Sequence, residues 1–285
     1  MEKKKIEEIY FSNKGILNKK ISEIKKDGIS RLHIVSDFDR TLTRCFYNGK
    51  KLPSTIALIR ENNYLTKDYP EKAFDLFNKY HPIEKDLSLD YSYRYKKMHE
   101  WWKRHEELLV KSGMSIEVIK DIAKNHKKIF RPGFSEFAGL LNKYNIPILI
   151  ISSGIGNLIE EYIKDKRIKN SYILANMLEF DSRGRATGYK GKIIHILNKS
   201  EAELSNKEYK KKISKRKNIV LLGDSIEDAN MADSINAKTI IKIGFLNEDV
   251  KEKLSIYKTR FDVVIVNDGS MGFVNALLKK VAEEQ

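Results

Sequence analysis

The chain has 285 residues, of which 41% are hydrophobic, so it is long enough to fold as a large domain with a smaller one beside it. Its single cysteine, Cys45, excludes an internal disulfide, and no apolar run reaches the roughly 20 residues that span a bilayer. We therefore expect a cytoplasmic protein with no membrane partner and no secretory signal. The net charge of +15 admits nucleic acid as a partner.

Apolar segments alternate with helical patterns along most of the chain. Residues 2–27 have the spacing of short amphipathic helices that stop at Gly28. Runs rich in Ile and Val then follow at 32–39, 146–154, 217–225, 238–245 and 261–268. Helical patterns occupy 135–144, 225–235 and 270–284. This alternation predicts an α/β fold with a doubly wound, mainly parallel sheet.

The stretch from 46 to 130 breaks the alternation, because it holds helical patterns without a convincing buried strand. Gly113 and Ser115 have the character of a helix stop and a helix N-cap within it. We expect residues 1–45 and 131–285 to form the α/β core. Residues 46–130 should form a helical cap over the carboxyl end of the first strand, the edge where open α/β sheets bind ligands.

Polar side chains gather where the predicted strands end. These residues are Asp37, Asp39, Ser152, Ser153, Lys199, Asp224 and Asp228. Taken singly, an aspartate after a strand is more often a cap or turn residue, and a lone lysine usually lies at the surface. Their common placement at one edge of the sheet favours a functional site.

The residue types suit cleavage of a phosphate ester. Asp37 and Asp39 are two positions apart on an extended segment and face the same way. Asp224 adds a third carboxylate, and such a cluster favours a hard cation such as Mg²⁺. The Ser152 hydroxyl and the Lys199 ammonium can hold phosphoryl oxygens. We therefore expect a phosphatase site with Asp37 as its nucleophile.

Four short motifs make the chain resemble the haloacid dehalogenase-like superfamily. They are DFDRT at 37–41, IISSG at 150–154, Lys199, and GDSIED at 223–228. Within that superfamily the chain is similar to the cytosolic pyrimidine 5′-nucleotidases of the cytosolic 5′-nucleotidase III type. Longer segments carry this similarity from about residue 30 to the C-terminus, among them HPIEKD, EWW, NMLEFDSRG, GYKGKIIHILNK and FDVVIVND.

The resemblance implies roles for the residues at the strand ends. Asp37 would take up the phosphoryl group, and Asp39 would protonate the leaving nucleoside oxygen and then activate water. Mg²⁺ would lie between the Asp37 carboxylate, the Asp39 carbonyl and Asp224, with Asp228 orienting this shell from behind. Phosphate would be bound by Ser152, Ser153 and Lys199.

The resemblance also implies base recognition by the cap. Glu84 matches a cap acid that reads the base, and its carboxylate could accept from the amine of cytosine or from a methylated guanine. His105 stands where the relatives hold a smaller polar residue, so it could alter which bases fit. One of Trp101 and Trp102 could stack on a base, although packing is the commoner role.

The sequence therefore predicts a monomeric, magnesium-dependent hydrolase of nucleoside 5′-monophosphates, with CMP and UMP as the expected substrates. One alternative is a phosphatase for another small phosphomonoester, such as phosphoserine. Another is a basic nucleic-acid-binding protein on a phosphatase fold, which would use the Lys-rich segment 209–217. Because basic residues usually stand beside acids in this chain, a solvated surface is the expected role of that segment.

Overall fold

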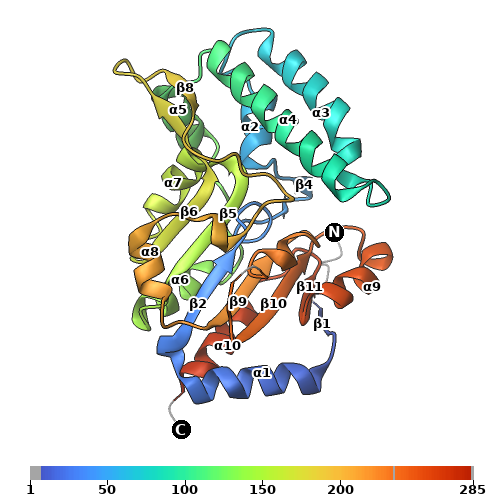
Figure 1. The fold of residues 1–285 in the computed structure, drawn as a ribbon, viewed down its shortest axis with the longest axis vertical. Coiled ribbons are helices and arrows are strands. Elements are labelled where there is room, and N and C mark those ends of the chain that lie inside the picture. The colour runs from blue at the N-terminus through green and yellow to red at the C-terminus, as the bar shows by residue number, and fades with distance from the viewer. Residues whose placement is uncertain (1–7, 234, 284–285) are drawn as a thin grey trace.

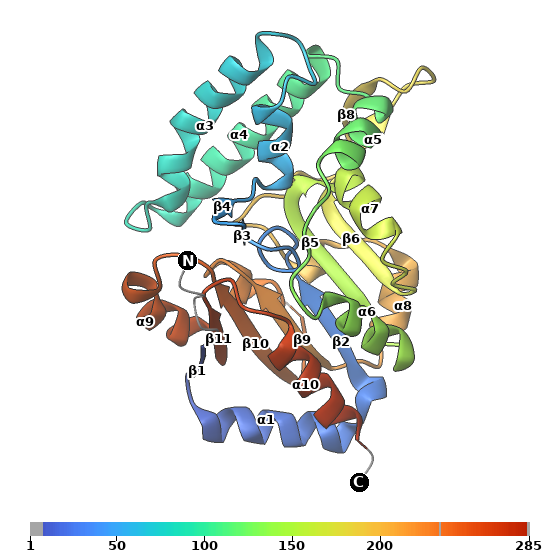
Figure 2. The same ribbon diagram turned by 180° about the vertical axis from the view of Figure 1, so that it is seen from behind.

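The computed structural model describes residues 8–233 and 235–283, and its centre is a seven-stranded sheet (Figures 1 and 2). The spatial order of the strands is β1-β11-β10-β9-β2-β5-β6. All neighbours are parallel except β1 and β11. The bounds are β1 Ile9–Phe11, β2 Leu32–Ser36, β5 Ile148–Ile155, β6 Ser171–Asn176, β9 Asn218–Gly223, β10 Thr239–Leu246 and β11 Val263–Val266. The predicted α/β class with a doubly wound, mainly parallel sheet is confirmed.

Alternating side chains of the strands enter two apolar layers, one on each face of the sheet. Val220 and Leu222 of β9 pack in the layer that includes side chains of α1, α6, α7 and α10. Ile219 and Leu221 pack in the opposite layer, with side chains of α8 and α9. The bounds are α1 Lys14–Asp27, α6 Phe134–Lys143, α7 Gly156–Lys164, α8 Lys207–Ile213, α9 Val250–Arg260 and α10 Gly272–Ala282. Burial on both faces explains why these strands are continuous apolar runs.

Two of the local predictions were wrong. The segment before residue 14 holds the edge strand β1, which pairs antiparallel with β11; residues 1–7 lie outside the described part of the chain. The helix expected over 225–235 is only a short 3-10 turn, Asp228–Asn230. There the Asp228 carboxylate accepts the backbone N–H groups of Asp224 and Ser225, and such side-chain bonds compete with a regular helix.

Four helices lie above the carboxyl ends of the central strands (Figure 1). They are α2 Thr55–Glu61, α3 Tyr69–Lys85, α4 Tyr91–Lys111 and α5 Ile116–Asn125, preceded by a small hairpin of β3 Phe46–Tyr47 and β4 Lys50–Lys51. Gly113, at φ 84°, directly follows Ser112, the C-cap of α4, and the Ser115 side chain caps α5, as expected. None of the described helices is long and apolar enough to cross a membrane.

A second hairpin, which the sequence did not reveal, packs against these helices. It consists of β7 Leu178–Phe180 and β8 Ala186–Tyr189. The N–H of Tyr189 donates to the Glu106 carboxylate of α4, and the N–H of Ala186 donates to the carbonyl of Met114. The predicted division into a core and a cap at residues 46–130 remains a prediction. In Figure 2, β8 of this hairpin lies beside α5.

The segment after β2 is fastened to the end of β11 through Asp268. The Asp268 carboxylate accepts the backbone N–H groups of Cys45 and Phe46 and pairs with Arg131, whose side chain is fully buried. The Cys45 side chain is also fully buried, and burial raises the pKa of its thiol to about 11. This environment suits a structural role for Cys45.

Candidate active site

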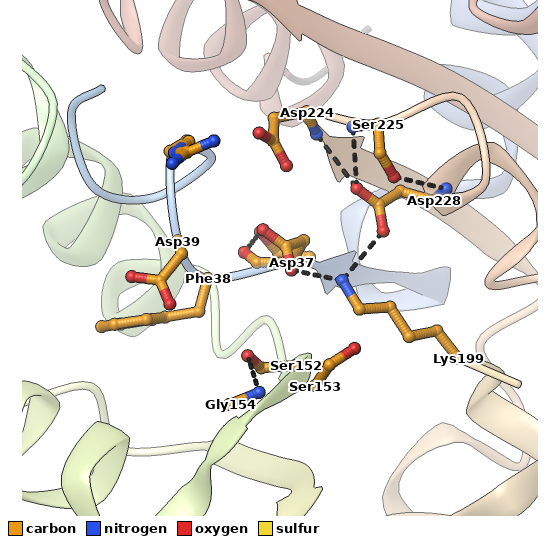
Figure 3. Close-up of polar contacts among 12 residues, drawn as sticks. Asp37, Phe38, Asp39, Ser152, Ser153, Gly154, Lys199, Asp224, Ser225 and Asp228 are labelled. Atoms are coloured by element: carbon orange, nitrogen blue, oxygen red, sulfur yellow. Dashed lines mark hydrogen bonds and ion pairs between the residues drawn. The ribbon is translucent and has the colours of Figure 1, made fainter. Parts of the chain in front are cut away.

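The ends of β2 and β9 bring three carboxylates together (Figure 3). Asp37 follows β2, Asp224 follows β9, and Asp228 begins the 3-10 turn after it. One oxygen of each lies within 4.8 Å of the others. The Lys199 ammonium stands against this group, 2.6 Å from Asp37 Oδ1 and 3.0 Å from Asp228 Oδ1. Side chains from three distant segments therefore meet at one edge of the sheet, as the sequence predicted.

The electrostatics of the cluster are those of crowded like charges. Burial, aided by the charges of Asp228 and Asp39, raises the pKa of Asp37 to about 6 despite the nearby ammonium of Lys199. Burial and the charges of Asp37 and Asp228 also raise the pKa of Asp224 well above its usual range. For Lys199, burial opposes the charged form, but the carboxylates of Asp228 and Asp37 outweigh it and raise the pKa. The single ammonium of Lys199 therefore does not balance the negative charge of the three carboxylates.

The free oxygens of the cluster suit a divalent cation. Both carboxylate oxygens of Asp228 already have partners, because Oδ1 pairs with Lys199 and Oδ2 accepts two backbone N–H groups. Asp37 Oδ2 is buried and has no hydrogen-bond partner among the described residues. A hard cation with oxygen ligands would satisfy this oxygen and offset the repulsion with Asp224, so the donor set fits Mg²⁺.

The Asp39 carboxylate is turned away from Asp224 and Asp228 (Figure 3). Its Oδ1 accepts from Lys128 Nζ at 2.8 Å, and its Oδ2 accepts from the N–H and hydroxyl of Thr55 at 2.8 and 2.7 Å. Burial alone would raise the pKa of Asp39, but these donors outweigh it and lower the pKa. Gly154 leaves room for Thr55 beside Asp39, because a Cβ at residue 154 would lie 2.2 Å from the Thr55 hydroxyl.

A cleft of about 710 Å³ connects this cluster to helices α2, α3 and α4. The described residues that line it include Asp37, Asp39, Ser152, Ser153, Lys199, Asp224, Glu84, His105, Trp101 and Trp102. Ser152 Oγ is buried and accepts the N–H of Gly154 at 3.0 Å. Asp228 stays behind the wall of the cleft, bonded to Lys199. Every predicted site residue therefore lies in the cleft or directly behind it.

The far end of the cleft is aromatic with a few polar groups. Trp101 stacks on Tyr80 with ring centroids 5.9 Å apart, and Trp102 lies edge-on to His105. Glu84 accepts from His81 Nδ1 at 3.0 Å, so one of its oxygens is already engaged. An aromatic surface beside a carboxylate can hold a flat ring that carries hydrogen-bond donors.

His105 is buried and uncharged. Its Nε2 lies 3.1 Å from the Tyr69 hydroxyl, and its Nδ1 has no partner among the described residues. Burial, with a smaller effect of the nearby Arg60 charge, lowers the pKa of His105 to about 3. The imidazole is therefore neutral across the physiological range.

We expect His105 to make the protein acid-sensitive. Its pKa in the unfolded chain is about 6.5, so protons bind the unfolded state preferentially below that pH, and stability is lost as pH falls toward 3. Between pH 7.5 and 5.5 the wild type should lose about 1.4 kcal/mol more unfolding free energy than His105→Phe. Urea denaturation at both pH values measures this difference. An identical pH dependence in the two proteins would show that His105 titrates normally.

Sequence reasoning missed several residues that shape the site. Thr55 and Lys128 hold Asp39, and Lys128 Nζ also donates to the Pro53 carbonyl at 2.6 Å. Arg131 donates to the carbonyl of Arg40, which has a positive φ of 63° directly after Asp39. No local motif marks these contacts, because Lys128 is 89 positions from Asp39.

Comparisons with known proteins agree with this geometry. The family model described as pyrimidine 5′-nucleotidase (UMPH-1) matches residues 40–282. The 7-methylguanosine phosphate-specific 5′-nucleotidase A of Xenopus laevis is 35% identical over 268 residues, covering 93% of this chain and 92% of its own. Its human counterpart is 33% identical, with 94% and 90% covered.

Solved structures show the same fold. Cytosolic 5′-nucleotidase IIIB bound to cytidine superposes with a TM-score of 0.87 at 29% identity, covering 96% of this chain and 93% of its own. A substrate-bound phosphoserine phosphatase superposes with a TM-score of 0.53 at 17% identity, covering 85% and 95%. The latter similarity concerns the fold alone.

Proposed function

Because the chain belongs to the pyrimidine 5′-nucleotidase family, we propose that it hydrolyses nucleoside 5′-monophosphates through a phosphoryl group carried on Asp37. The chain is a 5′-nucleotidase, and the proposal concerns its mechanism, metal and base preference. The observation that carries it is the meeting of Asp37, Asp224 and Lys199 at the floor of a cleft with an aromatic far end. A cytosolic location is part of the proposal, since a Caenorhabditis elegans relative is named putative cytosolic 5′-nucleotidase 3.

The first step forms a bond between an Asp37 oxygen and phosphorus and breaks the bond from phosphorus to the 5′ oxygen. To give a proton to that oxygen, so that the nucleoside leaves neutral, Asp39 must first turn from Lys128 and Thr55, the donors that lower its pKa, and take up a proton. In the second step water attacks phosphorus, Asp39 takes a proton from it, and the Asp37–phosphorus bond breaks to release phosphate. Lys199 and Ser152 hold the phosphoryl oxygens in both steps.

Asp37 and Asp224 would hold Mg²⁺, together with the carbonyl of Asp39. The chemistry that the ion supplies when bound is positive charge against the phosphoryl oxygens and the carboxylates. Asp228 keeps Lys199 in place and fixes the backbone of the loop that begins at Asp224.

The far end of the cleft would bind the base. The free Glu84 oxygen accepts from a donor on the ring edge, while Trp101 and Trp102 offer aromatic surface. Cytosine presents an exocyclic amine, which makes CMP the first candidate substrate. 7-Methylguanosine monophosphate is the second, because close relatives carry its name and its ring also presents donors. Uracil lacks the amine and should bind less well.

A substrate panel with Glu84→Ala tests the base assignment. Glu84→Ala should lower kcat/KM for CMP about 10- to 100-fold, as expected for the loss of a hydrogen bond to a charged group. It should leave p-nitrophenyl phosphate hydrolysis unchanged, because that substrate has no base. The panel is phosphate release from CMP, UMP, 7-methylguanosine monophosphate, GMP and phosphoserine, with Mg²⁺ and with EDTA.

Glu71→Ala is the matched control, since Glu71 is exposed on the same helix as Glu84. Equal losses on CMP and the aryl phosphate would refute base reading by Glu84. Equal wild-type turnover of phosphoserine and CMP would refute the nucleotide assignment. Undiminished turnover in EDTA would refute the requirement for a divalent metal ion.

A further inference from the structure

The turn between α3 and α4 lies above α9 (Figure 1), and it is close to the loop that follows β9. A second cavity of about 320 Å³ lies between them, lined by residues of both parts, including Glu84 and Leu87 above and Asp224 and Glu227 below. Arg94, in the first turn of α4, reaches the same loop beside this cavity. Its Nη2 lies 3.5 Å from Glu227 Oε1.

The same Nη2 atom also binds the base-reading end of α3. It donates to the carbonyl of Glu84 at 2.7 Å, directly behind the side chain that lines the cleft. The Arg94 side chain is only 7% exposed, and its Nε has no hydrogen-bond partner among the described residues. A guanidinium so poorly hydrated depends strongly on its counter-charge, and Glu227, 18% exposed, is the carboxylate within 4.0 Å of it in the described chain.

Glu227 belongs to the loop that positions the candidate metal ligands. It stands between Asp224 and Asp228, whose carboxylate accepts backbone N–H groups of this loop. A neighbouring contact runs in parallel, because the Tyr91 hydroxyl of α4 donates to the carbonyl of Leu197 at 2.9 Å, two residues before Lys199. The start of α4 is therefore joined to both segments that hold the phosphate end of the cleft.

We propose that Arg94 is a positioning residue that sets the distance between Glu84 and the loop from Asp224 to Asp228, through its ion pair with Glu227. The inference rests on the proposed function, because it supposes that Glu84 meets the base while the loop serves the phosphate. A nucleoside monophosphate must contact both ends of the cleft at once. A small phosphate ester contacts only the phosphate end, so the ion pair is irrelevant to it.

Two substitutions and their combination test the ion pair. Glu227→Gln keeps the size of the side chain and removes its charge, so it removes only the ion pair with Arg94. Arg94→Met keeps the aliphatic part of the side chain and removes both the ion pair and the hydrogen bond to the Glu84 carbonyl. Arg104→Gln is the control, since Arg104 lies on the same helix, 53% exposed, in an ion pair with Glu100 of that helix.

Glu227→Gln should raise KM for CMP about tenfold with kcat within about twofold of the wild type, a coupling typical of contacting side chains. Arg94→Met should raise KM for CMP at least as much. The double variant should raise KM for CMP no more than Arg94→Met alone does. KM and kcat for p-nitrophenyl phosphate at fixed Mg²⁺ should be unchanged in all three. A role in stability alone would lower the active fraction and hence kcat for both substrates.

An unchanged KM for CMP in Glu227→Gln would overturn the proposal, and so would equal rises in KM for CMP and the aryl phosphate. Additive effects in the double variant would also overturn it. If Arg94→Met does not fold, Glu227→Gln alone decides the matter. A wild type that releases phosphate from the aryl ester but from no nucleoside monophosphate would instead refute the proposed function.

Discussion

Asp37→Asn should lower phosphate release from CMP by about 10⁴-fold or more, as for other enzymes that lose a covalent nucleophile. The amide cannot form the acyl-phosphate, and it offers a poorer ligand to a cation. Malachite-green detection of phosphate, run with CMP and with p-nitrophenyl phosphate, measures the loss. Both substrates should be affected equally, because both pass through the same intermediate.

The loss should not come from unfolding. Asp37 is buried among like charges that raise its pKa, so a neutral amide at this position should leave the metal-free protein at least as stable as the wild type at pH 7. Asp121→Asn, at an exposed position of α5, serves as the matched control. Turnover of Asp37→Asn within tenfold of the wild type would rule out Asp37 as the nucleophile.

Asp39→Asn should lower steady-state turnover of CMP by about 10²- to 10⁴-fold, the range for loss of a general acid–base group. The nucleoside 5′ oxygen is a poor leaving group without a proton, whereas p-nitrophenolate leaves readily as an anion. The first step should therefore survive with the aryl ester, and the second step should not. Stopped-flow measurement should show a burst of about one p-nitrophenol per chain, followed by slow turnover.

The absence of a burst, with equal losses on both substrates, would contradict the assignment of Asp39. Thr55→Val is an informative companion, because it removes the hydroxyl that donates to Asp39 and keeps the backbone donor. Its effect should be much smaller than that of Asp39→Asn.

The central strands could be predicted because burial on both faces leaves a strong signal in the sequence. β2, β5, β9, β10 and β11 are dominated by Ile, Val and Leu. β1 has only three residues and is defined by its partner β11, so no periodicity marks it. The loop after β9 is apolar enough to suggest a helix, but the Asp228 carboxylate binds its backbone instead.

The candidate site likewise contains residues that could be predicted from the sequence and contacts that could not. Asp37, Ser152 and Asp224 could be placed together because parallel strands bring their carboxyl ends to one edge. The partners of Asp39 and of Glu227 could not, because they arise where distant segments touch. Lys128 meets Asp39 only after the chain has passed through four helices, and Arg94 meets Glu227 only where α4 approaches the loop that follows β9.

The buried thiol at residue 45 gives the chain a built-in reporter of motion. Its backbone N–H is held by Asp268, and its carbonyl accepts from Leu52, so it lies where the chain leaves the sheet for the helices above. An alkylating reagent can reach the sulfur only when this connection opens, and the high thiol pKa keeps the background reaction slow. Because no other cysteine competes, the labelling rate of the unmodified protein counts those openings directly.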